Sequence, residues 1–210
     1  MATAMVASSA LQQLATSLKR SASQEHMATS THDFVATVGE LMPFFAHLGP
    51  VLGVAKVEFS HKLQTLQAAA ARHPTLADVV AHDRAAGAAA AKNSPTRNLH
   101  RLVAAIQFIQ LLLERLMASP QVTLHEAASH AYDATLAPFH TALIRGVVRA
   151  GMLTLPSRAH FIAELGETEE SAAPRCGEVV ASCSAIAGSV SKLLAGIEFP
   201  VSDVWFWPSG

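Results

Sequence analysis

Hydrophobic residues recur every three or four positions along most of the chain, which is the spacing of one face of an α-helix. The clearest run has apolar side chains at positions 99, 102, 106, 109, 113 and 116. The chain is rich in Ala and Leu and only 6% aromatic, which favours helix over strand. The pattern predicts helices over 9–22, 31–48, 51–73, 75–85, 95–119, 123–151 and 168–195, and a short segment that opens at 156.

Two of these helices have clear starting signals. Ser94 is a good N-cap, and Pro95 fits the first helical position, where its missing N–H costs nothing. Thr123 and Glu126 have the spacing of a capping box. We therefore expect helices to begin at Pro95 and just after Thr123.

Three prolines fall inside predicted helices. Pro43 should kink its helix or shift the helix boundary. Pro138 predicts a kink just before His140, and Pro174 leaves the start of the last helix open.

The fold class expected from this pattern is all-α. We predict a single domain over residues 1–210, with seven or eight helices and a core over about 30–195. The first helix covers about 9–22, and the aromatic tail 199–210 is expected to be non-helical. No internal repeat of 20–50 residues is visible, which excludes a solenoid.

Composition adds an unusual amount of apolar side chain to this picture. Half of the 210 residues are hydrophobic, 15% are charged, and the mean hydropathy is +0.29. No apolar run reaches the ~18 residues that a membrane span needs. The formal net charge of −1 lacks the basic excess of a general nucleic-acid binder, so no nucleic-acid partner is expected.

Cysteine spacing and the N-terminal sequence favour a cytoplasmic protein. Cys176 and Cys183 are seven residues apart and match neither a CxxC motif nor a secreted disulfide framework, so we expect reduced structural thiols. No charged region precedes a continuous apolar stretch as in a secretory signal. The first 24 residues lack acids, faintly like a transit peptide, but their leucines have helical spacing.

The sequence contains no recognisable catalytic centre. No GxSxG, HExxH, Walker or GxGxxG motif occurs. The eleven histidines lack metal-ligand spacing; His125 and His130, for example, are five apart, which suits one helix face poorly. We expect no enzyme activity, no metal site and no cofactor.

Charged residues inside the apolar helices are more informative. Glu58 and Lys62 are four apart on one helix face, which is typical of a surface ion pair. Arg97 and Arg101 are also four apart, just after a helix start. Like charges at this spacing repel, and two guanidinium groups near a helix N-terminus match the oxygens of a phosphate. Spacing alone leaves a phosphate site and a solvated face both open, and His140 alone could be a core histidine.

Four segments, in order, resemble the glycolipid transfer protein superfamily. They are FFAHLG at 44–49 followed by Glu58 and Lys62, PTRNLHR at 95–101, LAPFH at 136–140 with Arg145, and GM at 151–152 through LPSRAH at 155–160. The resemblance covers about residues 30–165 and is nearest to the ceramide-1-phosphate transfer branch, of the plant type associated with control of cell death.

The resemblance implies a two-layer helical sandwich that encloses lipid chains in a hydrophobic chamber and reads the headgroup at its mouth. It implies a non-enzymatic carrier of phosphorylated sphingolipids, with ceramide-1-phosphate the expected ligand, that contacts membrane surfaces transiently. Glu58 would accept from the sphingoid amide N–H, and His140 would donate to the acyl-amide oxygen. Lys62, Arg97 and Arg101 would bind the phosphate.

The sequence departs from the family pattern at three places. Glu58 stands where phosphate-type members normally have Asp, and Ala142 replaces a Trp that helps docking on membranes. A further basic residue expected at 104–105 is replaced by two alanines. Glu58 and Ala142 keep open a lipid sensor or protein-interaction module with this fold, whereas Arg101 in place of the sugar-stacking Trp argues against a neutral-glycolipid carrier.

Two further sets of residues have two interpretations each. Five apolar residues are candidates for the chamber wall, with ordinary core as the alternative: Phe44, Phe45, Leu102, Ile106 and Ile109. Trp205 and Trp207 could lie at a membrane interface or cap the helical sandwich.

Overall fold

The computed structural model describes residues 9–22, 30–49 and 55–201. Its α-helices are α1 (Ala10–Ala22), α2 (Thr31–Leu41), α4 (Ala55–Ala70), α5 (Leu76–Ala85), α6 (Pro95–Met117), α7 (Leu124–Thr135), α8 (Ala142–Met152), α9 (Arg158–Glu164) and α10 (Glu169–Leu194). Two 3-10 helices, η1 (Met42–Leu48) and η2 (Ala137–Phe139), lie between them. Within these ranges the β-structure is an isolated bridge between Ser30 and Thr75. The all-α prediction is confirmed.

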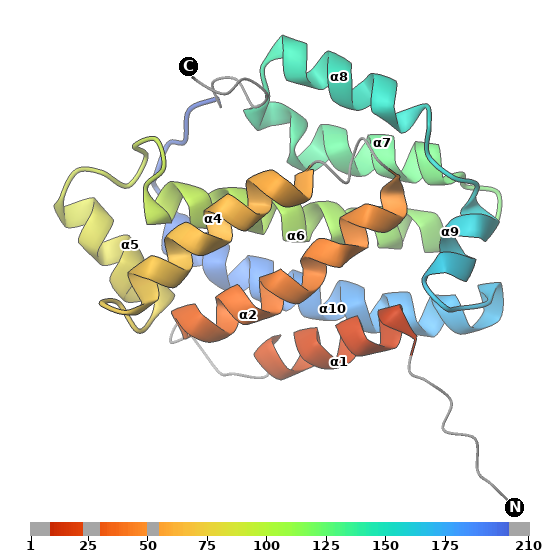
Figure 1. Cartoon of the computed structure of the whole chain (residues 1–210), viewed down its shortest axis with the longest axis horizontal. Coiled ribbons are helices and arrows are strands. Elements are labelled where there is room, and N and C mark those ends of the chain that lie inside the picture. Colours follow the sequence, from red (N-terminus) through yellow and green to blue (C-terminus); the bar gives the residue numbers. More distant parts are fainter. Residues whose placement is uncertain (1–8, 23–29, 50–54, 202–210) are drawn as a thin grey trace, which may run out of the picture.

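The helices form two layers. Figure 1 shows α1, α2 and α4 in front of α6, α7 and α10. Helix α6 is central, because it packs against α10, α7, α4 and α5. Helix α8 lies along the outer side of α7, and α9 closes the opposite end of the molecule from α5 (Figure 1).

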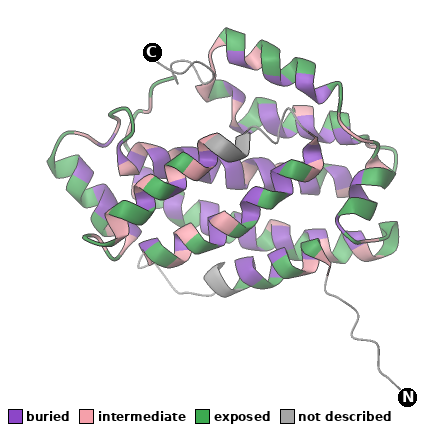
Figure 2. Cartoon of the chain, viewed as in Figure 1, coloured by how far each residue is buried: buried purple, intermediate pink, exposed green. Residues whose placement is uncertain are grey.

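The core lies between the layers. Figure 2 shows the buried positions on the faces that the helices turn toward one another. On α6, the predicted stripe from Leu99 to Leu116 is buried, with Leu99, Ile109 and Leu113 at 0% exposure. The 3-4 spacing of apolar residues therefore identified the core face of α6 correctly.

The predicted helix starts are confirmed. Ser94 accepts a hydrogen bond from the Arg97 backbone N–H at 3.1 Å, and Pro95 is the first helical residue. Thr123 and Glu126 form the expected capping box. The sequence did not reveal that buried Asp83 of α5 accepts from the Thr96 N–H at 2.9 Å, which places a carboxylate at the N-terminus of α6.

Pro138 breaks a helix where we expected a kink. Helix α7 ends at Thr135, η2 follows, and Thr141 caps a separate helix α8 by accepting from the Ile144 N–H. Pro138 lacks an N–H and Thr141 offers a new cap, so the chain starts a second helix in a new direction. This break gives nine α-helices in the described ranges, against the seven or eight expected.

The other two prolines behave differently. Pro43 shifts a boundary: α2 ends at Leu41 and the chain continues as the 3-10 helix η1. Pro174 lies inside α10 without ending it, and the cap at Thr168 confirms the expected start of the last helix.

Three sequence-based expectations concern the remainder of the chain. Cys176 and Cys183 are free and buried, and burial raises the pKa of each thiol to about 12. None of the helices in the described ranges is both long and apolar enough to span a membrane. Residues 199–201 of the aromatic tail are non-helical, and Trp205 and Trp207 lie outside the described residues.

Candidate functional site

The candidate site lies where three helices and the C-terminal segment meet. The N-terminal half of α6 contributes Arg97 and Arg101, α4 contributes Glu58 and Lys62, and the junction of η2 and α8 contributes His140. The segment after α10 runs up past this end of α6 (Figure 1). The five predicted site residues thus come from elements far apart in the sequence.

Glu58 and Lys62 form an ion pair on α4. The Lys62 side chain is 14% exposed and that of Glu58 is 30% exposed, so the pair is more buried than an ordinary surface pair. The i,i+4 spacing predicted this contact correctly, but not its burial.

Arg101 is the most buried of the five, with 7% of the residue exposed. Its guanidinium carbon lies 4.4 Å from the centre of the Phe139 ring, a cation–π arrangement. One terminal nitrogen, Nη1, lies 3.2 Å from His100 Nδ1, and the other donates to the Pro200 carbonyl. Aromatic rings and a backbone carbonyl therefore hold this cation in place.

Nothing in the described part of the chain neutralises Arg101. No Asp or Glu there lies within ion-pair distance of it, and its Nε is buried without a hydrogen-bond partner. Burial and the nearby charge of Arg97 lower the pKa of Arg101 to about 10. The guanidinium remains charged at neutral pH, so the site holds a buried cation with a donor to spare.

Arg97 lies one turn before Arg101, in the first turn of α6. It is partly buried, and its Nη2 donates to the Val201 carbonyl at 3.5 Å. Its charge acts on both His100 and Arg101. The two arginines therefore form one positive site within the first two turns of α6.

His140 lies within the field of the same charges. Burial first, and then the positive charges of Arg101, Lys62 and Arg145, lower the pKa of His140 to about 4, while Glu58 opposes the shift. The imidazole is therefore neutral at pH 7. These interactions place Arg101, Lys62 and Glu58 around His140.

Tyr132 contacts one ring nitrogen of His140. Its hydroxyl lies 2.9 Å from His140 Nδ1, and burial raises the pKa of Tyr132 to about 12, so the phenol keeps its proton. When this hydroxyl donates to Nδ1, the imidazole proton is on Nε2. The contact thus links the tautomer of His140 to the orientation of the Tyr132 hydroxyl.

Comparison with known proteins supports the resemblance found in the sequence. Residues 29–167 match the model of the family described as glycolipid transfer protein. The chain belongs to the glycolipid transfer protein family.

Relatives within this family point to one branch. The chain is 31% identical over 139 residues to the ACD11 homolog protein of Arabidopsis thaliana, a match that covers 66% of this chain and 61% of that protein. It is 33% identical over 90 residues to the ceramide-1-phosphate transfer protein of Mus musculus, covering 42% of each. The chain thus spans less than two thirds of either relative in these matches.

Solved structures agree. A variant of Arabidopsis accelerated-cell-death 11 in complex with ceramide-1-phosphate superposes with a TM-score of 0.82 at 26% identity, covering 90% of this chain and 95% of that one. The predicted fold and branch of the family are confirmed.

The five apolar residues suggested for the chamber are all buried in the core of this family member. Phe45 stacks on Phe108 with ring centres 5.8 Å apart, and Phe44 meets Phe161 edge-on at 5.7 Å. Leu102, Ile106 and Ile109 lie on the buried face of α6. Their role as a chamber wall stays a prediction.

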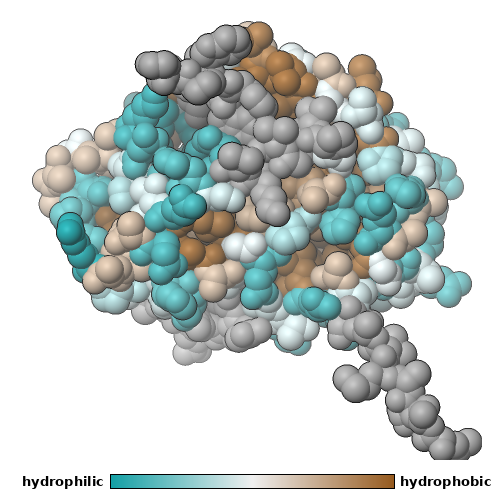
Figure 3. Space-filling view, viewed as in Figure 1, coloured by the Kyte–Doolittle hydropathy of each residue, from teal (hydrophilic) through white to brown (hydrophobic). Residues whose placement is uncertain are grey.

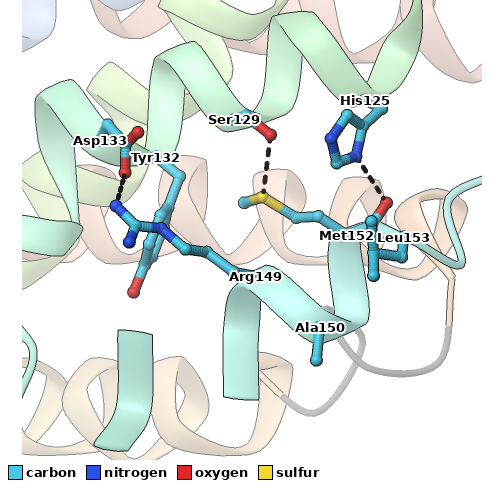
Figure 4. Close-up of a pocket in the computed structure, with 8 residues that line it drawn as sticks. All are labelled: His125, Ser129, Tyr132, Asp133, Arg149, Ala150, Met152 and Leu153. Carbon is cyan, nitrogen blue, oxygen red and sulfur yellow. Dashed lines mark hydrogen bonds and ion pairs between the residues drawn. The ribbon is translucent and has the colours of Figure 1, made fainter. Parts of the chain in front are cut away.

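A pocket of about 330 Å³ opens between α7 and α8 (Figure 4). His125 and the Met152 carbonyl meet at one end with 3.0 Å between Nδ1 and the oxygen, and Arg149 pairs with Asp133 at the other. The pocket contains none of the five predicted residues, but Tyr132 lines it and also contacts His140.

Sequence reasoning missed four residues that shape the site: His100, Tyr132, Phe139 and Phe199. His100 and Phe139 stood inside the quoted motifs but had no assigned role. Tyr132 is the only tyrosine of the chain, yet nothing in its spacing indicates His140 as a partner. Phe199 comes from 98 positions beyond Arg101, and only the fold places it there.

Proposed function

We propose that this protein carries phosphorylated sphingolipids, ceramide-1-phosphate in particular, between membranes without changing them covalently. The observation that carries the proposal is the arginine pair. Arg97 and Arg101 lie one turn apart at the start of α6, no carboxylate of the described chain pairs with either, and Arg101 Nε is buried without a partner. A phosphate would supply both the charge and the missing acceptors.

The other site residues suit the rest of a sphingolipid headgroup. Lys62 adds a third positive charge, and Glu58 offers a carboxylate that can accept from an amide N–H. His140 would donate to the amide oxygen through a ring N–H, and the Tyr132 hydroxyl, 2.9 Å from Nδ1, orients the ring. The proposed ligand then has an anion and an amide side by side.

The lipid chains would enter between the two helical layers. Exposing a sixteen-carbon chain to water costs roughly 12 kcal/mol at about 0.8 kcal/mol per CH₂, so a carrier must shield it. Apolar residues from both layers, Phe45 and Ile106 among them, form one continuous hydrophobic cluster, which would provide this shielding.

Helix α8 would supply the contact with membranes. Leu143 and Val147 share one face of α8 and are 73% and 43% exposed, and Leu153 just beyond the helix is 77% exposed. Figure 3 shows hydrophobic side chains along the top of the molecule, where Figure 1 places α8. His140 lies just before the helix, so docking through this face would bring the headgroup site to the membrane, and the protein would move between membranes through the cytosol.

A transfer assay tests the proposed function. Fluorescent ceramide-1-phosphate and galactosylceramide are offered in separate donor vesicles, and arrival in acceptor vesicles is followed with time. We expect rapid transfer of ceramide-1-phosphate and little transfer of galactosylceramide, because a neutral sugar cannot neutralise Arg97 and Arg101. Binding without transfer would indicate a sensor, and equal transfer of both lipids would contradict the headgroup assignment.

A double variant, Leu143→Ser with Val147→Ser, tests the docking face. Removing two apolar anchors should weaken partition onto phosphatidylcholine vesicles by tenfold or more, at roughly 1.5 kcal/mol or more for each fully buried side chain. Binding of a short-chain ceramide-1-phosphate free in solution should not change. Unaltered vesicle partition would remove α8 from the docking surface.

A further inference from the structure

The segment that follows α10 crosses the arginine pair. Gly196 has φ +77°, a conformation that suits glycine, and lets the chain leave the helix in a new direction. Arg84 fixes the point of departure, because its Nη2 donates to the carbonyls of Leu193 and Ala195 at 3.3 and 2.6 Å. From there the chain runs past the N-terminal end of α6 (Figure 1).

Three consecutive residues, Phe199–Val201, make the contacts. The Phe199 ring stacks on His100 with ring centres 4.1 Å apart and an interplanar angle of 11°. The Pro200 carbonyl accepts from Arg101 Nη2, and the Val201 carbonyl accepts from Arg97 Nη2 at 3.5 Å. Each arginine of the proposed phosphate site therefore already donates to an oxygen of this segment.

These oxygens are weaker partners than those of a phosphate. A carbonyl accepts hydrogen bonds but has no net charge, whereas hydrogen bonds between a guanidinium and an anion are roughly twice as strong as neutral ones. The segment also leaves Arg101 Nε without a partner. It occupies the site without neutralising it, so an anion with several oxygens can replace it.

We propose that Phe199–Val201 is a built-in competitor of the lipid phosphate, whose carbonyl oxygens occupy the Arg97–Arg101 site and leave when a phosphorylated headgroup binds. This rests on the proposed function, since the competing ligand is its phosphate. A lipid without phosphate cannot displace the segment. The contact therefore keeps both arginines hydrogen-bonded when no lipid is bound and disfavours binding of neutral lipids.

The variant Phe199→Ala tests whether the segment weakens or strengthens lipid binding. Loss of the stack on His100 should free the segment and tighten binding of short-chain ceramide-1-phosphate by about 3- to 10-fold, the range that an aromatic pair contributes. Val180→Ala, which trims a partly buried apolar side chain of α10 instead, is the control and should bind as the wild type does. If the segment instead helped to position the arginines, Phe199→Ala would bind more weakly with the fold intact, and the proposal would be overturned. Unchanged affinity would overturn it too.

A label on the segment tests displacement directly. Val201 is 51% exposed, so Val201→Cys can carry an environment-sensitive dye, and the two native cysteines are buried and unreactive. Short-chain ceramide-1-phosphate should change the emission of the dye, and short-chain ceramide without phosphate should not. No change on binding of ceramide-1-phosphate would overturn the competitor while leaving the carrier function intact.

Inorganic phosphate tests the competitor proposal even if the carrier proposal fails. If the protein binds no ceramide-1-phosphate, the carrier proposal fails, but millimolar phosphate at constant ionic strength should still move the label, and chloride should not. A label that responds to neither lipid nor phosphate would overturn the competitor as well.

Discussion

Arg101 and Arg158 are both largely buried, and they lie at opposite ends of α6. Of Arg101, 7% is exposed, and of the Arg158 side chain, 13%. Both guanidinium groups lose most of their water on folding, which costs free energy unless polar partners replace it. The two ends of the helix provide these partners in different ways.

At the C-terminal end of α6, Arg158 has both a charged partner and several carbonyl acceptors. It binds the Glu169 carboxylate through Nε and Nη2, each with a contact of 2.9 Å. Its Nη1 also donates to the carbonyl of Leu116 and, at 3.2 and 3.3 Å, to those of Ser119 and Val122. A cation beside the last carbonyls of a helix is favoured by the helix dipole.

At the N-terminal end, Arg101 has none of these advantages. Arg97 adds a like charge one turn away, and the partners of Arg101 are uncharged. The partners of Arg158 neutralise its charge, whereas those of Arg101 do not. The arrangement around Arg101 suits an anion that comes from outside the chain.

The largest expected effect is on the free energy of unfolding, and it concerns Arg158 at the C-terminal end of α6. Arg158→Ala should lower the free energy of unfolding by about 2–4 kcal/mol, because it removes a charge-assisted carboxylate pair and leaves helix-end carbonyls without a donor. Urea unfolding measures this. Arg175→Ala, which removes a partly exposed ion pair of α10 with Glu178, is the control and should cost less than about 1 kcal/mol. If Arg158→Ala cost no more than this control, Arg158 would not stabilise this end of α6.

The next largest effect concerns the N-terminal end of α6, where substitutions should slow lipid transfer. Arg101→Ala and Arg97→Ala should each slow ceramide-1-phosphate transfer by about 10- to 150-fold at low protein concentration, since each charge-assisted hydrogen bond contributes roughly 1.5–3 kcal/mol. Arg101→Lys should recover only part of the rate, because an ammonium group lacks the bidentate fork. The free energy of unfolding should fall less in these variants than in Arg158→Ala. Wild-type transfer by both alanine variants, with the fold intact, would refute the phosphate site.

The smallest effect is the dependence of stability on pH between 7 and 5, which we expect at the Arg101 end, where two histidines with lowered pKa values lie. Burial and the nearby arginines lower the pKa of His100 to about 4, and that of His140 is equally low. In the unfolded chain both histidines protonate near pH 6.5. Their contribution to the free energy of unfolding is therefore fully present above pH 6.5 and is lost as the pH falls from 6.5 to 4. Between pH 7 and 5 we expect a loss of roughly 1 kcal/mol per histidine, after discounting for partial exposure.

Chemical denaturation at the two pH values measures this loss. Replacing either histidine by Gln should remove about half of the difference. Arg101→Ala should reduce it as well, since its charge contributes to both pKa shifts. A difference that persists in the double histidine variant would assign the pH dependence to other groups.

Much of this architecture was predictable from local sequence. The apolar stripe of α6, its start at Ser94-Pro95 and the capping box at Thr123 depend on neighbours within one or two turns, and each was predicted correctly. The pair Glu58 and Lys62 is local in the same sense. The effect of Pro138 was predicted only in part. The sequence indicated a disturbed helix, but whether the helix kinks or ends depends on whether Thr141 caps a new one, as it does.

The surroundings of the candidate site were not predictable in this way. Spacing placed Arg97 and Arg101 on one helix face but left open whether that face was solvated, and the resemblance to the family, rather than physics, grouped them with His140. The sequence alone determined the helices and the repulsion between the two arginines, because both follow from separations of three or four residues. Only the tertiary structure decided that Arg101 is buried on Phe139, that Tyr132 contacts His140, and that Pro200 and Val201 reach the arginine pair. Those contacts join residues separated by up to about a hundred positions, and their geometry depends on how the layers pack, which no local pattern encodes.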